Sequence, residues 1–120
     1  MDTPAAPTDI LLKRESRVLE IAFADGARFS LPAEYLRVES PSAEVQGHGP
    51  SQRKLVAHKG RVGFTGAHPV GAYAIRLIFD DGHDTGIYTW PYLRELGENQ
   101  DMRWADYLAR LEAAGLSRGI

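Results

Sequence analysis

The chain of 120 residues contains no cysteine. That absence excludes a disulfide framework, a thiolate zinc finger, a cysteine-ligated iron–sulfur cluster and a cysteine nucleophile. The sequence also has no apolar run near the roughly 20 residues that a membrane-spanning helix needs. Residues 1–7 lack the basic and apolar segments of a secretory signal. We therefore expect a cytoplasmic protein that does not associate with membranes.

Neither sign of charge is in large excess. Lys and Arg number 14 and Asp and Glu number 16, which gives a net charge of −2. Such a balance provides no general attraction to nucleic acid or anionic lipid. With 43% apolar and 25% charged residues, the composition is that of one ordinary globular domain. We predict a single domain over residues 9–115, with a disordered tail at 1–8 and a second tail at 116–120.

Apolar alternation predicts antiparallel strands through most of the chain. Residues 9–13, 17–23 and 27–31 alternate, and Asp25-Gly26 between two of these runs is a strong hairpin signal. Residues 72–79 are apolar on much of both faces, which indicates a central strand. Connections this short favour antiparallel hairpins over parallel crossovers. We expect an α+β fold, with a β-meander in one or two small sheets.

Two helices are predicted to follow the strands. Thr89 is a suitable N-cap, Pro91 fits the first turn, and Gly97 lies where this short helix ends. The C-terminal helix is amphipathic, with its apolar residues at i, i+3, i+4 and i+7: Trp104, Tyr107, Leu108 and Leu111.

Two segments of the chain resemble one another. Phe-Ala-Asp-Gly at 23–26 precedes Tyr-Leu-Arg at 35–37, and Phe-Asp-Asp-Gly at 79–82 precedes Tyr-Leu-Arg at 92–94. One interpretation is that any hairpin followed by a short helix gives this pattern. The other is that two copies of one unit pack in a single sheet.

Chemistry-bearing residues gather at the second Asp-Gly turn. His83 lies between Asp81 and Asp84, whose carboxylates would raise its basicity or share a metal with it. A histidine in such a turn is most often simply exposed. Residues 39–54 form a long loop that contains Ser42 and His48, and loops of this length are usually functional or mobile. The histidine spacings match no metal motif, and no serine lies in a nucleophile elbow.

A local basic stretch follows that loop. Arg53-Lys54, His58-Lys59 and Arg61 are of the kind that touches phosphate or an acidic partner. An ordinary solvated face is the alternative interpretation.

Three segments, 36–49, 70–75 and 79–90, resemble a small bacterial family. This is the stand-alone form of the gamma-butyrobetaine hydroxylase-like N-terminal domain, a domain of unknown function. The similarity runs from about residue 10 to 97 and omits the final helix. In the hydroxylases this domain precedes a separate catalytic domain that depends on iron and 2-oxoglutarate. No residues remain here to build one, so the resemblance implies that the protein is not an enzyme.

The resemblance also implies a former metal site. In the hydroxylases the domain holds a structural zinc through a Cys-x-Cys-x-x-Cys run and one later histidine. Here the cysteine positions fall on Ser40, Ser42 and Val45, and the histidine falls on His83. Neither hydroxyl nor valine replaces a thiolate on zinc, so we expect no cofactor. If the fold is shared, residues 40–42 and His83 lie close together.

These expectations lead to two functional hypotheses. The first is a small non-enzymatic interaction module with a protein partner and no nucleic-acid or membrane partner. Similar domains fused to ATP-binding carriers suggest a role beside iron–sulfur or metalloenzyme maturation. Its ligand or partner surface would comprise five residues: His83, Asp81, Asp84, Ser42 and His48. The alternative is a zinc- or iron-binding domain that uses His83 with nearby carboxylates or His48.

Overall fold

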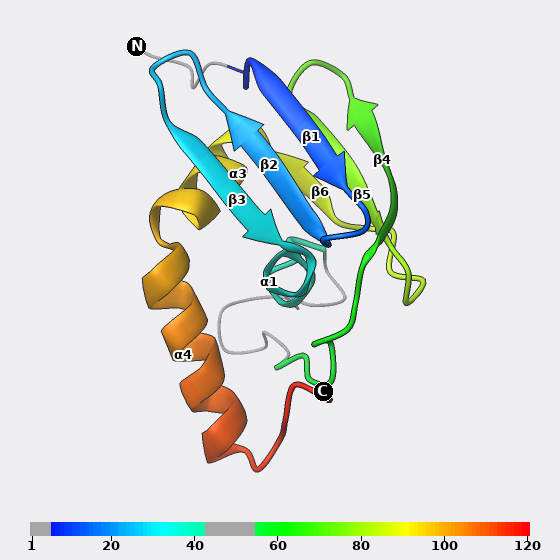
Figure 1. Ribbon diagram of the computed structural model, residues 1–120, viewed down its shortest axis with the longest axis vertical. Helices are drawn as coiled ribbons and strands as arrows, with labels where there is room; N and C mark the ends of the chain where they lie inside the picture. Colours follow the sequence, from blue (N-terminus) through cyan, green and yellow to red (C-terminus); the bar gives the residue numbers. More distant parts are fainter. Residues whose placement is uncertain (1–5, 43–54) are drawn as a thin grey trace.

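A computed structural model describes residues 6–42 and 55–120 of the chain (Figure 1). In chain order the elements are β1 (Asp9–Lys13), β2 (Val18–Ala22), β3 (Arg28–Pro32), α1 (Ala33–Val38), β4 (Phe64–Val70), β5 (Ala74–Phe79), β6 (Ile87–Thr89), α3 (Trp90–Glu98) and α4 (Gln100–Ala113). The described residues form two antiparallel three-stranded sheets with helices beside them. The predicted α+β class is confirmed. The predicted site residue His48 lies outside the described residues.

Each sheet is built by one half of the chain. The first has the strand order β1-β2-β3 and the second β4-β5-β6, and a helix follows the third strand of each. The repeat is therefore present, but the hypothesis that both copies share one sheet is wrong. Each copy has a third strand of its own, β1 or β4, and buries its apolar face against the other copy instead of pairing with it edge to edge.

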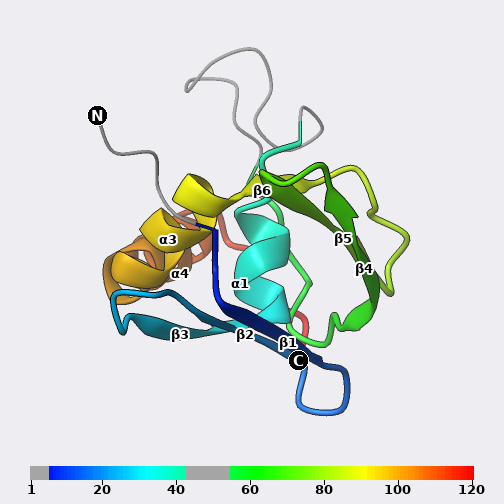
Figure 2. The same ribbon diagram turned by 90° about the horizontal axis from the view of Figure 1, so that it is seen from above.

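The two sheets meet at an angle along β1 and β4, and α1 lies in the space between them (Figure 2). Strand β5 is central, as predicted, with β4 and β6 on either side. Ile75, Leu77 and Phe79 of this strand point into the core. Tyr73 precedes this strand in the β4–β5 turn and is 57% exposed.

The core gathers apolar side chains from both sheets and from two helices. Leu36 in α1 and Leu93 in α3, the middle residues of the two Tyr-Leu-Arg segments, have no exposed surface. Leu19, Leu31 and Leu77 are equally buried. Complete burial of a leucine side chain contributes on the order of 2 kcal/mol, so both helices are held mainly by packing against the sheets.

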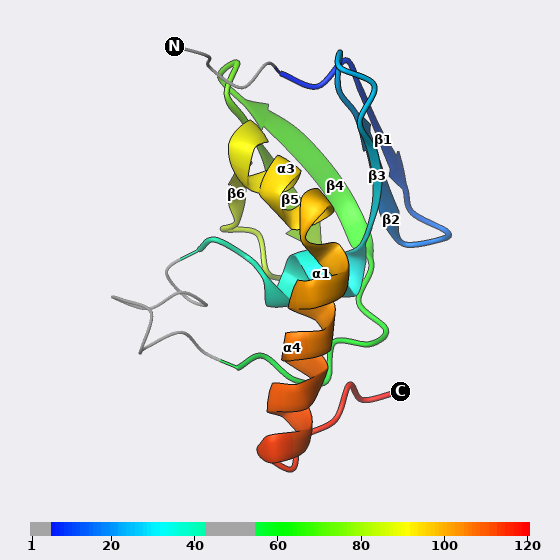
Figure 3. The same ribbon diagram turned by 90° about the vertical axis from the view of Figure 1, so that its left-hand side faces the viewer.

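Helix α3 begins as predicted, because the Thr89 side chain accepts a hydrogen bond from the Tyr92 backbone N–H. Helix α4 extends beyond the sheets, and the last residues of the chain return toward α1 (Figure 3). Residues 116–120 lie against residues 58–60 through two backbone hydrogen bonds. Arg118 also donates twice to the buried carboxylate of Glu34. Within 6–42 and 55–120, no helix is long and apolar enough to cross a bilayer.

Candidate functional site

The first half (residues 9–41) and the second half (residues 64–98) contain the same turn. The first turn, residues 23–27, follows β2, and the second turn, residues 79–83, follows β5. Each contains a glycine with a positive φ angle, which only glycine adopts freely: Gly26 at +92° and Gly82 at +93°. In each, the residue after the glycine donates its backbone N–H to the aspartate carboxylate: Ala27 to Asp25 over 3.2 Å and His83 to Asp81 over 3.0 Å.

The tyrosines of the two Tyr-Leu-Arg segments make reciprocal hydrogen bonds between the halves. Tyr35 in α1 donates its hydroxyl proton to the Leu96 carbonyl over 2.7 Å. Tyr92 in α3 donates to the Glu39 carbonyl over 2.5 Å. The two tyrosines are 57 residues apart (92 minus 35), and the same shift relates the two acceptors. The halves are therefore related by an approximate two-fold axis.

The arginines of these segments obey the same relation. Arg37 of the first half pairs with Asp81 in the second turn, with 2.9 Å between Nε and Oδ2. Arg94 of the second half pairs with Asp25 in the first turn, with 2.7 Å between Nη2 and Oδ2. Each turn is thus tied by a charge pair to the helix of the opposite half.

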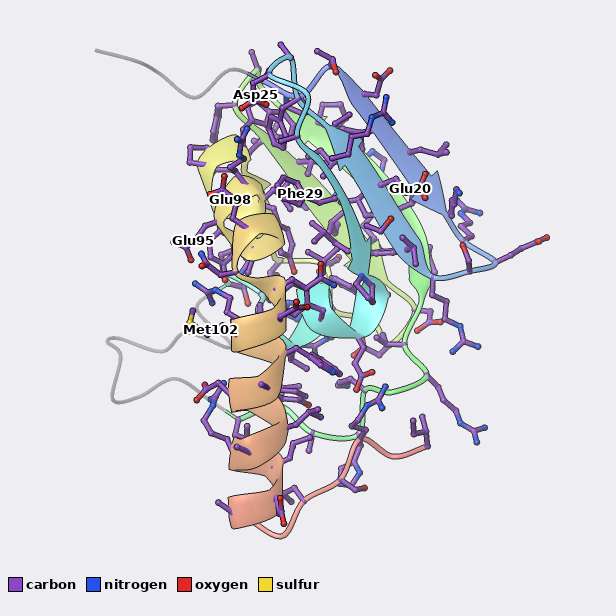
Figure 4. The ribbon with its side chains drawn as sticks, turned by 60° about the vertical axis from the view of Figure 1, so that its left-hand side comes forward. Glu20, Asp25, Phe29, Glu95, Glu98 and Met102 are labelled. Atoms are coloured by element: carbon purple, nitrogen blue, oxygen red, sulfur yellow. The ribbon has the colours of Figure 1, made fainter. Side chains whose placement is uncertain are left out.

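The halves differ in what fills the space beneath each turn. In the first half the Phe29 ring fills it, facing α3, where a Cβ atom on Gly97 would lie 2.4 Å from the ring (Figure 4). The positions related to these two by the 57-residue shift are Gly86 and Ser40. There the glycine is on the strand side, and a Cβ atom on it would lie 2.7 Å from Ser40 Oγ. An apolar ring in one half is replaced by a small polar group in the other.

A buried polar cluster results beneath the second turn. His83 Nε2 lies 2.9 Å from Ser40 Oγ and 3.5 Å from Ser42 Oγ. Ser40 Oγ also accepts the Ser42 backbone N–H over 3.3 Å. The proximity of residues 40–42 to His83, expected from the family resemblance, is confirmed. Exposure is 0% for Ser40 and 7% for both Ser42 and His83, so His83 is not the exposed turn histidine that its sequence setting favours.

Side chains from three elements position the serines. Helix α1 leaves carbonyl groups without intrahelical partners at its C-terminus. Tyr88 in β6 donates its hydroxyl proton to the Leu36 carbonyl over 2.5 Å, and Tyr92 in α3 donates its hydroxyl proton to the Glu39 carbonyl. Arg103 in α4 binds the buried Glu39 carboxylate over 2.8 Å. Because Ser40 follows Glu39 directly, these bonds fix the place at which the chain reaches His83.

Asp81 is the charged centre of the second turn. Its Oδ2 atom is shared by two cations, Arg37 at 2.9 Å and Lys59 at 2.6 Å, while Oδ1 accepts the His83 backbone N–H. Burial alone would raise the pKa of Asp81. The hydrogen bonds from Lys59, the His83 backbone and Arg37 outweigh burial and lower that pKa to about 2.

The structure brings together some of the predicted site residues and separates others. His83, Asp81 and Ser42 lie in one cluster. The exposed Asp84 faces Arg76 instead, with 3.8 Å between their charged groups, and its backbone carbonyl accepts from the same arginine. The predicted surface did not include Arg37, and it did not include Lys59, which was named only in the local basic stretch. The available signal was the shared Tyr-Leu-Arg and Asp-Gly pattern, which places an arginine and an aspartate at equivalent positions in both halves.

The cluster does not fit the zinc implied by the family resemblance. Two of the cysteine positions are Ser40 and Ser42, whose neutral hydroxyls hydrogen-bond the imidazole, and the third, Val45, lies outside the described residues. Structural zinc takes thiolate or imidazole ligands in a closed tetrahedron. Among residues 6–42 and 55–120, no three His, Cys, Asp or Glu side chains are grouped so that they could hold a metal ion.

These features define the class of protein: a two-sheet α+β domain with a repeated turn and a buried serine–histidine cluster under one copy. The sequence assigns the family. Residues 10–94 match the family described as "Gamma-butyrobetaine hydroxylase-like, N-terminal", and the chain belongs to this family. Helix α4, including Arg103, lies beyond the matched residues.

Solved structures are similar to nearly the whole chain. One structure determined by NMR is 50% identical with a TM-score of 0.84, covering 97% of this chain and 91% of its own. A second is 55% identical with a TM-score of 0.82, covering 98% and 86%. A crystal structure of a protein of unknown function from Acidithiobacillus ferrooxidans, of the DUF971 family, is 41% identical with a TM-score of 0.67, covering 81% and 98%. No curated protein matches the sequence.

Proposed function

We propose that this protein is a small, non-enzymatic interaction module of the cytoplasm. The exposed side of the second turn, flanked by Arg37 and Lys59, is its protein-binding surface. A component of iron–sulfur or metalloenzyme maturation is the kind of partner that the family resemblance suggests. One observation carries the proposal. The two halves share the same turn and reciprocal bonds between them, but of the two turns only the second has a buried polar cluster beneath it and a second cation beside its aspartate.

The chemistry of the cluster favours binding over catalysis. In a serine–histidine–aspartate triad the carboxylate holds the imidazole and the serine oxygen faces substrate. Here both oxygens of Asp81 are engaged by the His83 backbone and by two cations, and Ser40 has no exposed surface. The cluster is suited to shaping the turn above it, because buried polar groups with satisfied hydrogen bonds specify one local conformation.

Affinity capture from the native cell tests the binding surface. The bait with Asp84→Lys and Lys59→Glu should lose the partner that the unchanged protein retains. The control bait carries Arg28→Glu. Arg28 directly follows Ala27 of the first turn, as Asp84 directly follows His83 of the second, so this variant changes the charge at the equivalent position. We expect it to retain the partner. Equal retention by all three baits, each folded by circular dichroism, would contradict the proposal.

Metal analysis tests the competing metal-binding hypothesis. Protein purified without a histidine tag should contain no stoichiometric zinc or iron, and His83→Ala should not change its metal content. A stoichiometric metal that is lost in His83→Ala would overturn the interaction module in favour of a metal-binding domain.

A further inference from the structure

Lys59, the second cation at the second turn, comes from a segment without regular secondary structure. Residues 55–63 belong to no helix or strand, yet the Lys59 ammonium lies 2.6 Å from Asp81 Oδ2. A lysine side chain is long and flexible, and an ordered contact costs it rotamer freedom. Such a contact therefore requires a fixed backbone at position 59.

The residues after α4 fix this backbone on both sides of Lys59. The preceding residue, His58, donates its backbone N–H to the Ser117 carbonyl over 3.0 Å. The following residue, Gly60, donates its backbone N–H to the Arg118 carbonyl over 2.7 Å. Figure 1 shows the residues after α4 returning to the segment that leads into β4. Position 59 is therefore held by residues that follow it by almost 60 positions.

The two stretches approach each other closely at a glycine on each side. A Cβ atom on Gly60 would lie 2.9 Å from the Arg118 carbonyl oxygen, and one on Gly119 would lie 2.9 Å from His58 Cα. His58 has a φ angle of +61°, in the left-handed region that residues other than glycine rarely adopt. Such a conformation persists only where neighbouring contacts fix it. A side chain at either glycine would separate the two stretches.

Arg118 anchors the residues after α4 to the core. Its guanidinium donates two hydrogen bonds to the Glu34 carboxylate, over 2.8 and 2.6 Å, and lies 5.4 Å from the centre of the Trp104 ring. The side chain of Glu34 is 8% exposed. A buried carboxylate that loses its cation is strongly destabilising, so this ion pair opposes the release of residues 117–119.

We propose that residues 117–119 form a clamp that holds Lys59 in place at the second turn, with Arg118 as the positioning residue. The clamp acts through the backbone of residues 58–60, and Lys59 carries its effect to Asp81. The clamp lies beyond the matched residues 10–94, so it connects the C-terminal part of the chain to the family's domain. Its consequence for partner binding rests on the proposed function, because Lys59 flanks the surface proposed there.

Acylation of lysine amines in the full chain, followed residue by residue with mass spectrometry, tests the clamp. The anchor variant, Glu34→Gln with Arg118→Met, removes the ion pair without leaving a buried charge unpaired. It should raise the acylation rate of Lys59 several-fold, because the amine is no longer held against a carboxylate, and leave the rate of Lys13 unchanged. The control, Asp106→Asn with Arg110→Met, removes an exposed ion pair of α4 and should change neither rate.

Two further variants test whether the clamp acts through the contact with Asp81. Gly60→Ala, which keeps the anchor but adds a Cβ atom against residue 118, should also raise the Lys59 rate. Asp81→Asn should raise that rate by itself, and adding the anchor variant to it should cause no further increase. An additional increase in this combination, an equal increase at Lys13, or an unchanged Lys59 rate in both clamp variants would overturn the inference.

Acylation needs no native partner, so the clamp and the proposed function can fail separately. If the clamp controls the binding surface, the anchor variant used as a bait should capture less of the partner than the unchanged protein. Faster acylation of Lys59 with unaltered capture would contradict only the proposed function. Capture lost in the anchor variant without faster acylation of Lys59 would contradict only the clamp.

Discussion

In the first half of the molecule an aromatic ring packs beneath the turn, whereas in the second half hydrogen-bonded polar side chains lie beneath the equivalent turn. Phe29 packs against α3 in the first, while Ser40 and His83 meet beside Gly86 in the second. The backbone bonds of both turns and the tyrosine bonds between the halves are the same, and an arginine–aspartate pair ties each turn to the opposite half. The bonds that both halves share stabilise the fold. The different residues beneath the two turns mark the part of the molecule that the sequence has specialised.

The largest effect is expected from Gly86→Ala, which removes the space that admits Ser40. The new Cβ atom would lie 2.7 Å from Ser40 Oγ and 3.0 Å from Tyr88 Cε1. Overpacking of this kind lowers the free energy of unfolding by about 2–3 kcal/mol, measurable by urea denaturation. Gly66→Ala is the control, because its nearest neighbour would be 3.8 Å away. Equal losses in both variants would show that the second half does not depend on this close approach.

A smaller effect on the free energy of unfolding is expected from Asp81→Asn, which alters the acid dependence of the second turn. The pKa of Asp81 falls from 3.8 to about 2 on folding, so its stabilisation is complete above pH 4 and is lost as pH falls from about 4 to 2. Asp81→Asn should lower the free energy of unfolding by about 1–2 kcal/mol at pH 6 and remove that part of the acid sensitivity. Unfolding curves at several pH values measure both.

Asp25→Asn is the counterpart in the first half. The bond from Arg94 also lowers the pKa of Asp25, but this carboxylate is exposed, and solvent screens exposed pairs. We expect a smaller change in stability and in acid sensitivity. A larger effect at Asp25 than at Asp81 would reverse the comparison between the turns.

The reciprocal tyrosine bonds are expected to contribute about equally. Tyr35→Phe and Tyr92→Phe should each lower the free energy of unfolding by about 1 kcal/mol, because each leaves a carbonyl without its donor. Tyr35 should have the somewhat larger effect, since it is fully buried and Tyr92 is not. Chemical denaturation checks both values. If either variant had no effect on stability, the two tyrosine bonds would not be equivalent in the two halves.

A smaller effect still is expected from Lys59→Met, at about 0.5 kcal/mol, because Arg37 still neutralises Asp81. Lys13→Met, which removes an exposed pair with Glu20, should change stability by even less. High-precision thermal unfolding resolves the two. A loss at Lys59 as large as that in Asp81→Asn would show that Lys59 stabilises the fold instead of being available for a ligand.

The repeat could be predicted because its signals are local. An Asp-Gly pair between apolar strands specifies a hairpin, and two such hairpins each lead to Tyr-Leu-Arg. The bonds that those tyrosines and arginines make could not, because they join residues 44 to 69 positions apart. Periodicity carries no information on such pairings. For the same reason, the sequence was equally compatible with one sheet that holds both copies of the repeat and with two separate sheets.

The burial of His83 was also beyond local reasoning. A polar residue after an Asp-Gly pair is usually exposed, and the serines that cover it lie more than 40 positions earlier in the chain. The family resemblance predicted the proximity of His83 to residues 40–42. It assigned no role to Arg37 or Lys59, because these residues are absent from the zinc ligand set that the resemblance supplied.

Site-specific photocrosslinking in the native cell tests most directly whether the second turn is the contact surface. A photoreactive amino acid placed at position 84 follows the second turn, and one placed at 28 occupies the equivalent position after the first. We predict a discrete protein adduct from position 84 that is absent from position 28 and lost when Lys59→Glu is added. An adduct from position 28 alone, or the same adduct from both positions, would contradict the account.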